Sequence, residues 1–272
     1  MESLITHYSV RDIEARILDA LRAAGLNPEQ RLTPQELGAL DHFHTGGFPA
    51  SLRLLELSQI QAGERVLDIG AGLAGAARML AASPGCNVDC IELSRDYCIG
   101  AELLNRLTGL DEQINIHEGS ALALPFPDDS FDAAWMQNVG MNIADKRTLY
   151  AEVYRVLKPG GRFAFQEMAA GDAAVSYFPL PWATDPADNL LVSAEQMQSL
   201  LGEIGFITEF FEDASDSQLG GVAPVKNTPE VAPPAPLSLS AYVDNLGQKA
   251  ENAQRSLREG QIRFVRGVFQ AK

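Results

Sequence analysis

From Glu64 onward, short apolar segments alternate with amphipathic segments of helical period, and this alternation limits the possible folds most. We predict strands at 65–70, 87–93, 113–119, 131–137 and 162–168, and helices at 75–83, 95–107 and 145–157. Strands that alternate with helices form a parallel sheet with helices on both faces. The sequence therefore predicts an α/β fold.

Other helices flank this core, and two irregular segments interrupt it. Helices are predicted at 10–24, 34–40, 50–60, 194–205 and 241–259, with further strands at 206–213 and 262–270. The segments 169–193 and 215–243 are rich in proline and too long for plain connections. We predict a helical N-terminal cap or lid (1–60), a core (61–213), an insertion with a Pro-rich loop and a helix (214–260), and a final core strand (261–272).

Composition excludes several classes of partner. The formal net charge is −15, which disfavours nucleic acid and anionic lipid. Apolar runs are too short to cross a membrane, and the N-terminal segment lacks the apolar core of a signal peptide. The three cysteines, Cys86, Cys90 and Cys98, match no zinc spacing, so we predict no metal and reduced thiols in a cytoplasmic protein.

A glycine-rich turn follows the first core strand. Gly70-Ala-Gly72-Leu-Ala-Gly75 fits G-x-G-x-x-G, a turn that presents backbone N–H groups to a ligand at a helix start. Glu92 ends the second strand, where a carboxylate can accept both hydroxyls of a ribose. An NAD-dependent oxidoreductase is one interpretation, and a turn that binds nothing is another. Asp68 disfavours the first, because a carboxylate beside the turn suits a cationic ligand better than a pyrophosphate.

Three segments together resemble class I S-adenosylmethionine-dependent methyltransferases. These are Val66–Gly72, residues 121–135, and Arg155–Arg162, in family order and spacing over roughly residues 40–210. Quinone C-methyltransferases and sarcosine/dimethylglycine N-methyltransferases are the most similar branch, and His44–Gly47 and Met141–Lys146 resemble the latter group. The resemblance implies a Rossmann-like, seven-stranded, mostly parallel sheet with its last strand antiparallel. It also implies a helical N-terminal cap and inserted segments at the acceptor site.

The resemblance also assigns residues to the cofactor. It implies that Asp68, Gly70, Ala71 and Gly72 hold the methionine portion, that Glu92 binds the ribose, and that Leu93, Ser120 and Ala121 lie at the adenine. Relatives have Gly-Asp-Ala where this chain has Gly119-Ser120-Ala121, so a charge-assisted bond to the adenine is lost here. Tyr8, Thr45, Gly46 and Gln137 complete the predicted cofactor contacts.

The candidates around the acceptor have structural alternatives. His44, Glu167 and Asn138 are the catalytic candidates, although His44 could cap a helix and Glu167 could partner a base. Tyr177, Phe178, Trp182 and Met141 are the substrate candidates, and the aromatics could equally be lid packing. A sulfonium methyl is already activated, so positioning and water exclusion can supply much of the rate.

These observations lead to one preferred function and two alternatives. We predict transfer of a methyl group from S-adenosylmethionine to an N, O or C atom of a small-molecule acceptor, leaving S-adenosylhomocysteine. The alternatives are a nucleotide-dependent oxidoreductase and a non-catalytic scaffold that binds S-adenosylmethionine. Neither nucleic acid nor membrane is an expected partner, and a homodimer is left open because the Pro-rich loop and last helix could pack on a second subunit.

Overall fold

A seven-stranded sheet forms the centre of the molecule, for which a computed structural model describes residues 7–219 and 237–272. The strand order is β3-β2-β1-β4-β5-β7-β6. The strands are β1 (Arg65–Ile69), β2 (Asn87–Glu92), β3 (Ile114–Glu118), β4 (Phe131–Gln137), β5 (Leu157–Ala170), β6 (Phe206–Asp213) and β7 (Ile262–Ala271). β1 to β5 pair in parallel, whereas β7 runs antiparallel to β5 and β6. The predicted Rossmann-like sheet is confirmed.

Helices lie before and between the strands. They are α2 (Ile13–Ala23), α3 (Pro34–Asp41), α4 (Gly47–Ser58), α5 (Gly75–Ala82), α6 (Arg95–Thr108), α7 (Lys146–Val156), α8 (Ala194–Ile204), α9 (Ser215–Leu219) and α10 (Leu246–Arg258). Short 3-10 helices lie at Gly140–Asn142 (η1), Pro186–Asp188 (η2) and Leu239–Ala241 (η3). None of the helices in the described ranges is long and apolar enough to cross a membrane.

Three helices and one strand begin three or more residues from their predicted starts: α2 begins at Ile13 rather than at 10, and β5 at Leu157 rather than at 162. α4 begins at Gly47 rather than at 50, because Pro49 lies in its first turn, where a proline is tolerated. α10 begins at Leu246 rather than at 241, because Asn245 is left-handed (φ 54°) and separates it from η3. Most of the predicted Pro-rich loop, residues 220–236, lies outside the described residues.

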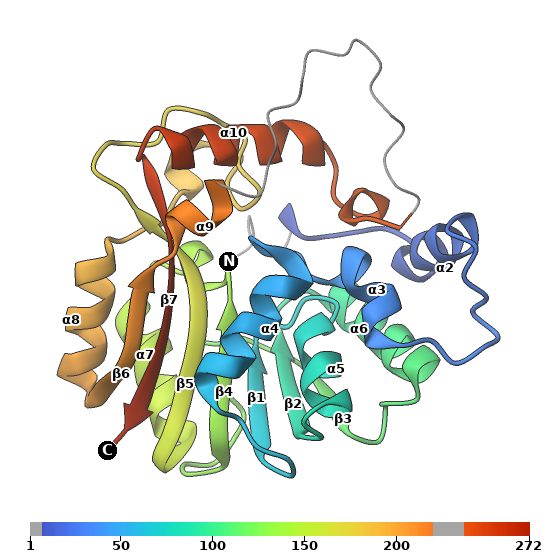
Figure 1. Cartoon of the computed structure of the whole chain (residues 1–272), viewed down its shortest axis with the longest axis horizontal. Coiled ribbons are helices and arrows are strands. Elements are labelled where there is room, and N and C mark those ends of the chain that lie inside the picture. Colours follow the sequence, from blue (N-terminus) through green and yellow to red (C-terminus); the bar gives the residue numbers. More distant parts are fainter. Residues whose placement is uncertain (1–6, 220–236) are drawn as a thin grey trace.

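The two faces of the sheet are covered by different helices (Figure 1). α4, α5 and α6 cover one face, where Trp135 of β4 is fully buried among their apolar side chains. α7 and α8 cover the other face around Phe163 and Phe165 of β5. α4 therefore belongs to the helical layer on the sheet, although the predicted N-terminal cap included it. α10 runs across the carboxyl end of the strands (Figure 1).

A buried ion pair fastens the N-terminal helices to the core. Asp41, at the end of α3, accepts a hydrogen bond from Arg78 of α5 at 2.7 Å, and both side chains are fully buried. Burial raises the pKa of Asp41, but Arg78 and His42 outweigh burial and hold it below its usual value. Arg78 also donates to Asn105 of α6 and to the Leu73 carbonyl. One guanidinium thus joins three helices and the glycine turn.

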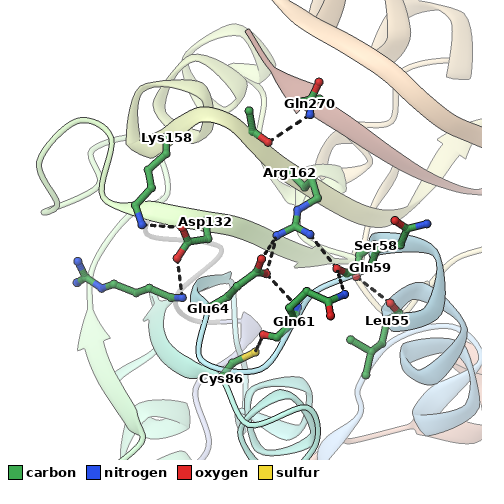
Figure 2. A network of polar contacts seen from close by, with 12 residues as sticks. Leu55, Ser58, Gln59, Gln61, Glu64, Cys86, Asp132, Lys158, Arg162 and Gln270 are labelled. Atoms are coloured by element: carbon green, nitrogen blue, oxygen red, sulfur yellow. Dashed lines mark hydrogen bonds and ion pairs between the residues drawn. The ribbon is translucent and has the colours of Figure 1, made fainter.

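A second polar network stabilises the sheet at the amino-terminal ends of its central strands (Figure 2). Arg162 of β5 donates to both carboxylate oxygens of Glu64 at 2.5 Å and to the Gln59 carbonyl at 2.8 Å. Lys158 contacts Asp132 at 2.6 Å. These contacts connect the start of β1 to β4 and β5. Arg162, the last residue of the Arg155–Arg162 motif, therefore has a structural role.

Candidate active site

A cavity of about 1380 Å³ lies at the carboxyl end of β1, β2 and β4. Ligands of open α/β sheets bind at this edge. Most of the predicted site residues line the cavity: Tyr8, His44, Thr45, Gly46, Asp68, Gly70, Ala71, Gly72, Glu92, Leu93, Ser120, Ala121, Gln137, Asn138, Met141 and Trp182. The fold therefore brings together residues that are up to 174 positions apart in the sequence. Three predicted site residues do not line the cavity: Glu167, Tyr177 and Phe178.

Glu167 lies behind the cavity wall, fully buried in β5. Its carboxylate accepts hydrogen bonds from the backbone N–H groups of Val139 (2.7 Å), Gly140 (2.8 Å) and Met141 (3.4 Å). Burial raises the pKa of Glu167 to about 7, against the effect of these donors. The side chain thus positions the segment that follows β4.

Tyr177 and Phe178 attach the inserted segment to α10. The Tyr177 hydroxyl donates to Glu259 at 2.7 Å, and the Arg255 guanidinium lies 3.9 Å from its ring centre. Phe178 packs against the cluster that contains Trp182 and Leu257. Trp182 does line the cavity, and its indole N–H donates to Asn189 at 2.9 Å. These three aromatics therefore divide between packing and the cavity wall.

The glycines of the turn are needed for two different close approaches. Gly70 has φ +65°, and a Cβ there would lie 2.4 Å from a Val139 methyl group. A Cβ at Gly75 would lie 2.4 Å from the Asp41 carbonyl oxygen and 2.7 Å from His42 Nδ1. Gly70 therefore lets the turn approach the loop after β4, and Gly75 lets the N-terminal cap dock on α5.

Glu92 connects β2 to the turn. Its carboxylate accepts from the backbone N–H of Gly72 at 2.9 Å and of Ser94 at 2.8 Å. Burial raises the pKa of Glu92. Each carboxylate oxygen can accept a second hydrogen bond. Glu92 is therefore fixed in the cavity wall and can still accept from a pair of ligand hydroxyls.

Asp68 supplies a buried negative charge beside the turn. The residue is 3% exposed, and its Oδ2 has no hydrogen-bond partner in the structure. Burial and the nearby Glu92 carboxylate raise the pKa of Asp68 to about 7. An unpartnered buried carboxylate oxygen is costly, and a ligand with a cationic N–H group would satisfy it. The turn, Asp68 and Glu92 together fit the amino-acid and ribose ends of S-adenosylmethionine.

A chain of hydrogen bonds behind the cavity fixes the orientation of Gln137. The indole N–H of Trp135 donates to Gln137 Oε1 at 2.8 Å, and an indole nitrogen can only donate. The amide oxygen of Gln137 must therefore face Trp135, which settles its orientation. Ser51 of α4 donates to the same oxygen at 3.0 Å. Because the Ser51 hydroxyl proton is used there, its oxygen accepts from His44 Nε2, 3.0 Å away.

The hydrogen bonds made by Gln166, on the other side of the His44 ring, indicate the same tautomer. Gln166 Nε2 lies 3.1 Å from the Thr45 carbonyl oxygen and 2.8 Å from His44 Nδ1, so this amide nitrogen donates to both. His44 therefore carries its proton on Nε2, and both ring nitrogens are engaged. Burial and the neighbouring His42 lower the pKa of His44 to about 3. His44 is a neutral residue held within the wall.

The remaining predicted contacts lie along the cavity. Tyr8 donates its hydroxyl to Asn142 at 3.3 Å, and Ser120 accepts from the Leu122 N–H at 3.2 Å. Asn138 follows β4 with φ 56°, a left-handed conformation that asparagine tolerates. Sequence reasoning did not identify Ser51 or Gln166. The signal for Gln166 was a polar residue in the middle of the apolar strand FAFQEM.

Comparisons with known proteins identify a domain family and a fold. Residues 67–165 match the family model described as "Methyltransferase domain". The glycine/sarcosine/dimethylglycine N-methyltransferase of Actinopolyspora halophila is 40% identical over 110 residues, which are 40% of this chain and 20% of that protein. The 24-methylenesterol C-methyltransferase 2 of Oryza sativa subsp. japonica is 37% identical over 115 residues, 42% of this chain and 32% of that protein. The chain thus spans a third or less of these two relatives.

Similarity to a solved structure extends over the whole chain. Geranyl diphosphate methyltransferase in complex with GPP and sinefungin superposes with a TM-score of 0.70 at 18% identity, covering 100% of this chain and 98% of that one. At this identity the similarity concerns the fold. The comparisons give no support to the oxidoreductase alternative. Residues 67–165 match the methyltransferase domain family, and the chain has the fold of the class I S-adenosylmethionine-dependent methyltransferases.

Proposed function

We propose that this protein transfers a methyl group from S-adenosylmethionine to a small-molecule acceptor. The observation that carries the proposal is the single cavity shared by Asp68, Glu92 and the glycine turn at the carboxyl edge of the sheet. The methyltransferase domain match over the same turn supports it. When bound, S-adenosylmethionine supplies an activated methyl group on a sulfonium, which is transferred by in-line displacement.

The residues of this chain have distinct tasks in that reaction. Asp68 and the backbone of the turn hold the amino-acid end of the cofactor, Glu92 the ribose, and Leu93, Ser120 and Ala121 the adenine. Tyr8, Thr45 and Gly46 close over it. The walls exclude water and orient the acceptor, which is how positioning accelerates such a reaction.

The catalytic candidates then act by orientation. We propose that His44, with both ring nitrogens engaged, fixes the wall around Gln137 rather than removing a proton. Glu167 acts indirectly, because its carboxylate fixes the backbone of residues 139–141. Asn138 lies in the wall itself, next to Met141.

The cellular setting is part of the same proposal. Cys86, Cys90 and Cys98 are free and buried, which suits a reducing compartment such as the cytoplasm. A homodimer is tested by light scattering of the purified protein across a concentration series. A constant monomer mass would exclude it.

Calorimetric titration with S-adenosylhomocysteine tests the cofactor assignment. We expect binding by the wild type and a loss of affinity of about tenfold or more in Glu92→Gln, because Glu92 would contact the ribose. Glu118→Gln is the matched control, since Glu118 ends the adjacent strand, pairs with Arg95 and does not line the cavity. Binding of NADH in place of S-adenosylhomocysteine would overturn the proposal. Tight binding of S-adenosylmethionine without formation of S-adenosylhomocysteine in the presence of any acceptor tried would favour the scaffold.

A further inference from the structure

The half of the cavity away from the glycine turn is roofed by the C-terminal part of α10, where Ala253 and Leu257 pack in the cluster of Met141, Met168 and Trp182. Leu246, at the start of the helix, packs with the cluster that contains Leu73 of the turn. Leu246, Ala250, Ala253 and Leu257 line the cavity from this helix. Their spacing of four, three and four places them on one helical face. Apolar side chains from other elements complete this half: Met141, Met168, Pro181, Trp182 and Leu190. The total volume, about 1380 Å³, exceeds that of an ordinary single-ligand pocket, so a bulky acceptor has room beside the cofactor.

The charge of the lining is one-sided. Among the lining residues that the structure describes there is neither lysine nor arginine, whereas Asp41, Asp68, Glu92, Asp145 and Asp188 are all present. Asp41 is already paired with Arg78. Residues 1–6 and 220–236, outside the described ranges, contain a single basic side chain, Lys226.

Two lysines lie near the cavity without lining it: Lys146, and Lys249 of α10, whose charge acts on the lining residue His7. Lys146 is buried, and its ammonium group donates to the carbonyl oxygens of Gly140 (2.7 Å), Leu190 (2.8 Å) and Ile143. Burial lowers the pKa of the lining histidines His7 and His44, which favours their neutral forms. An anionic acceptor would therefore lose its hydration beside carboxylates without gaining a lining cation, and the described residues contain no group of three or more His, Cys, Asp or Glu side chains that could hold a bridging metal ion.

We propose that the acceptor is a bulky apolar molecule without negative charge, bound under α10. The inference rests on the proposed function and narrows its substrate class. It separates this chain from geranyl diphosphate methyltransferase, to which it is similar in fold and whose solved complex holds GPP. It equally disfavours amino-acid acceptors such as sarcosine, which carry a carboxylate.

Matched pairs of probes test the charge preference. Geraniol and geranyl diphosphate form one pair, and naphthol and naphthyl phosphate the other. Each is titrated into the wild type in the presence of Mg2+, with and without saturating S-adenosylhomocysteine. We expect at least one neutral probe to bind, and its phosphorylated partner to bind about tenfold more weakly or not at all. Equal or tighter binding of a phosphorylated probe, or no binding of either neutral probe, would overturn the inference.

Two tryptophan variants on α10 test the position of the probe. Ala250→Trp fills the roof and is expected to weaken binding of the neutral probe about tenfold, with S-adenosylhomocysteine affinity unchanged. Gln248→Trp is the control, since Gln248 is exposed and does not line the cavity. An unchanged neutral-probe affinity in Ala250→Trp would also overturn the inference. A wild type that fails to bind S-adenosylhomocysteine contradicts the proposed function instead, and the titrations without it still measure the charge preference.

Discussion

The Oγ of Ser51 lies 3.0 Å from Nε2 of His44, so one buried hydroxyl links the imidazole to the amide of Gln137. Removing it leaves the imidazole N–H without an acceptor and Gln137 Oε1 with one donor fewer. A buried polar group that loses its partner costs about 1–3 kcal/mol. We therefore expect Ser51→Ala to lower the free energy of unfolding by that amount, measured by urea denaturation.

A matched control lies on the same helix. Ser58 is equally buried, but its hydroxyl donates only to the Leu55 carbonyl within α4. Ser58→Ala should cost about 1 kcal/mol or less, because the only group that loses its partner is a helical carbonyl. Equal losses in the two variants would contradict the linked arrangement of His44, Ser51 and Gln137.

Asp68 should make stability depend on pH. Its pKa is about 7 in the folded protein against an ordinary 3.8, so between these values the folded state binds more protons than the unfolded state. The contribution of Asp68 to the free energy of unfolding is then fully present below pH about 4 and is lost as pH rises to about 7, with a slope of up to about 1.4 kcal/mol per pH unit. Asp68→Asn lacks this loss.

Urea denaturation at pH about 4.5, 6 and 8 measures the effect. The stability of Asp68→Asn relative to wild type should rise over this range and level off above pH about 7. Asp111→Asn, at an exposed site, is the control. A difference between Asp68→Asn and wild type that stays constant with pH would show that Asp68 is ionised throughout.

Ligand binding should shift the same proton. The ammonium group of S-adenosylhomocysteine beside Asp68 favours the ionised carboxylate, so binding at pH about 6 is expected to release a proton. Calorimetry in two buffers of different ionisation enthalpy counts the protons released. Asp68→Asn should bind more weakly and release none. Equal proton release by both proteins would place the ammonium group elsewhere.

Gly75 should be sensitive to the smallest substitution. In Gly75→Ala the new methyl group would lie 2.4 Å from the Asp41 carbonyl oxygen, so α3 must move away from α5. Overpacking of this kind costs about 1–3 kcal/mol. Gly202→Ala is the control, because nothing lies within 4 Å of its Cβ in α8, and alanine there is expected to stabilise. Chemical denaturation of both variants decides, and an unaffected Gly75→Ala would mean that the cap is loosely docked.

Arg162→Lys should affect stability but not ligand binding. One terminal nitrogen of Arg162 contacts both oxygens of Glu64 and the other donates to the Gln59 carbonyl (Figure 2), and a lysine keeps the charge but lacks the second nitrogen. We expect a loss of about 1–2 kcal/mol, with S-adenosylhomocysteine affinity unchanged. Arg147→Lys, in an exposed pair with Glu203, should cost almost nothing. Weaker binding of S-adenosylhomocysteine by Arg162→Lys would mean that contacts at the amino-terminal ends of the strands affect the cavity at their carboxyl ends.

The regular part of the fold was predictable because its signals are local. The five parallel strands and the helices between them follow from apolar periodicity, and the glycine turn with Asp68 and Glu92 was identified from spacing alone. The antiparallel final strand was predictable only through the family resemblance, since no local pattern specifies which strands will pair.

The less regular parts depend on contacts between distant residues. Nothing near Glu167 in the sequence indicates that three backbone N–H groups of residues 139–141 occupy its carboxylate. Likewise, Tyr177 belongs to an aromatic-rich segment, but its partners Arg255 and Glu259 are some eighty residues away. Ser51 looks like an ordinary small helical residue until β4 places Gln137 opposite it.

The position of β7 between β5 and β6 also determines when this molecule can fold. β5 and β6 emerge from the ribosome before residues 262–271, which form their common partner strand. Until then both strands have an unpaired edge, and pairings between such distant segments form slowly. The β3-β2-β1-β4-β5 sheet can assemble during synthesis, but β6 and the α10 roof can join it only after translation of β7. An early stop within residues 262–271 should therefore leave an aggregation-prone chain rather than a slightly shortened folded protein.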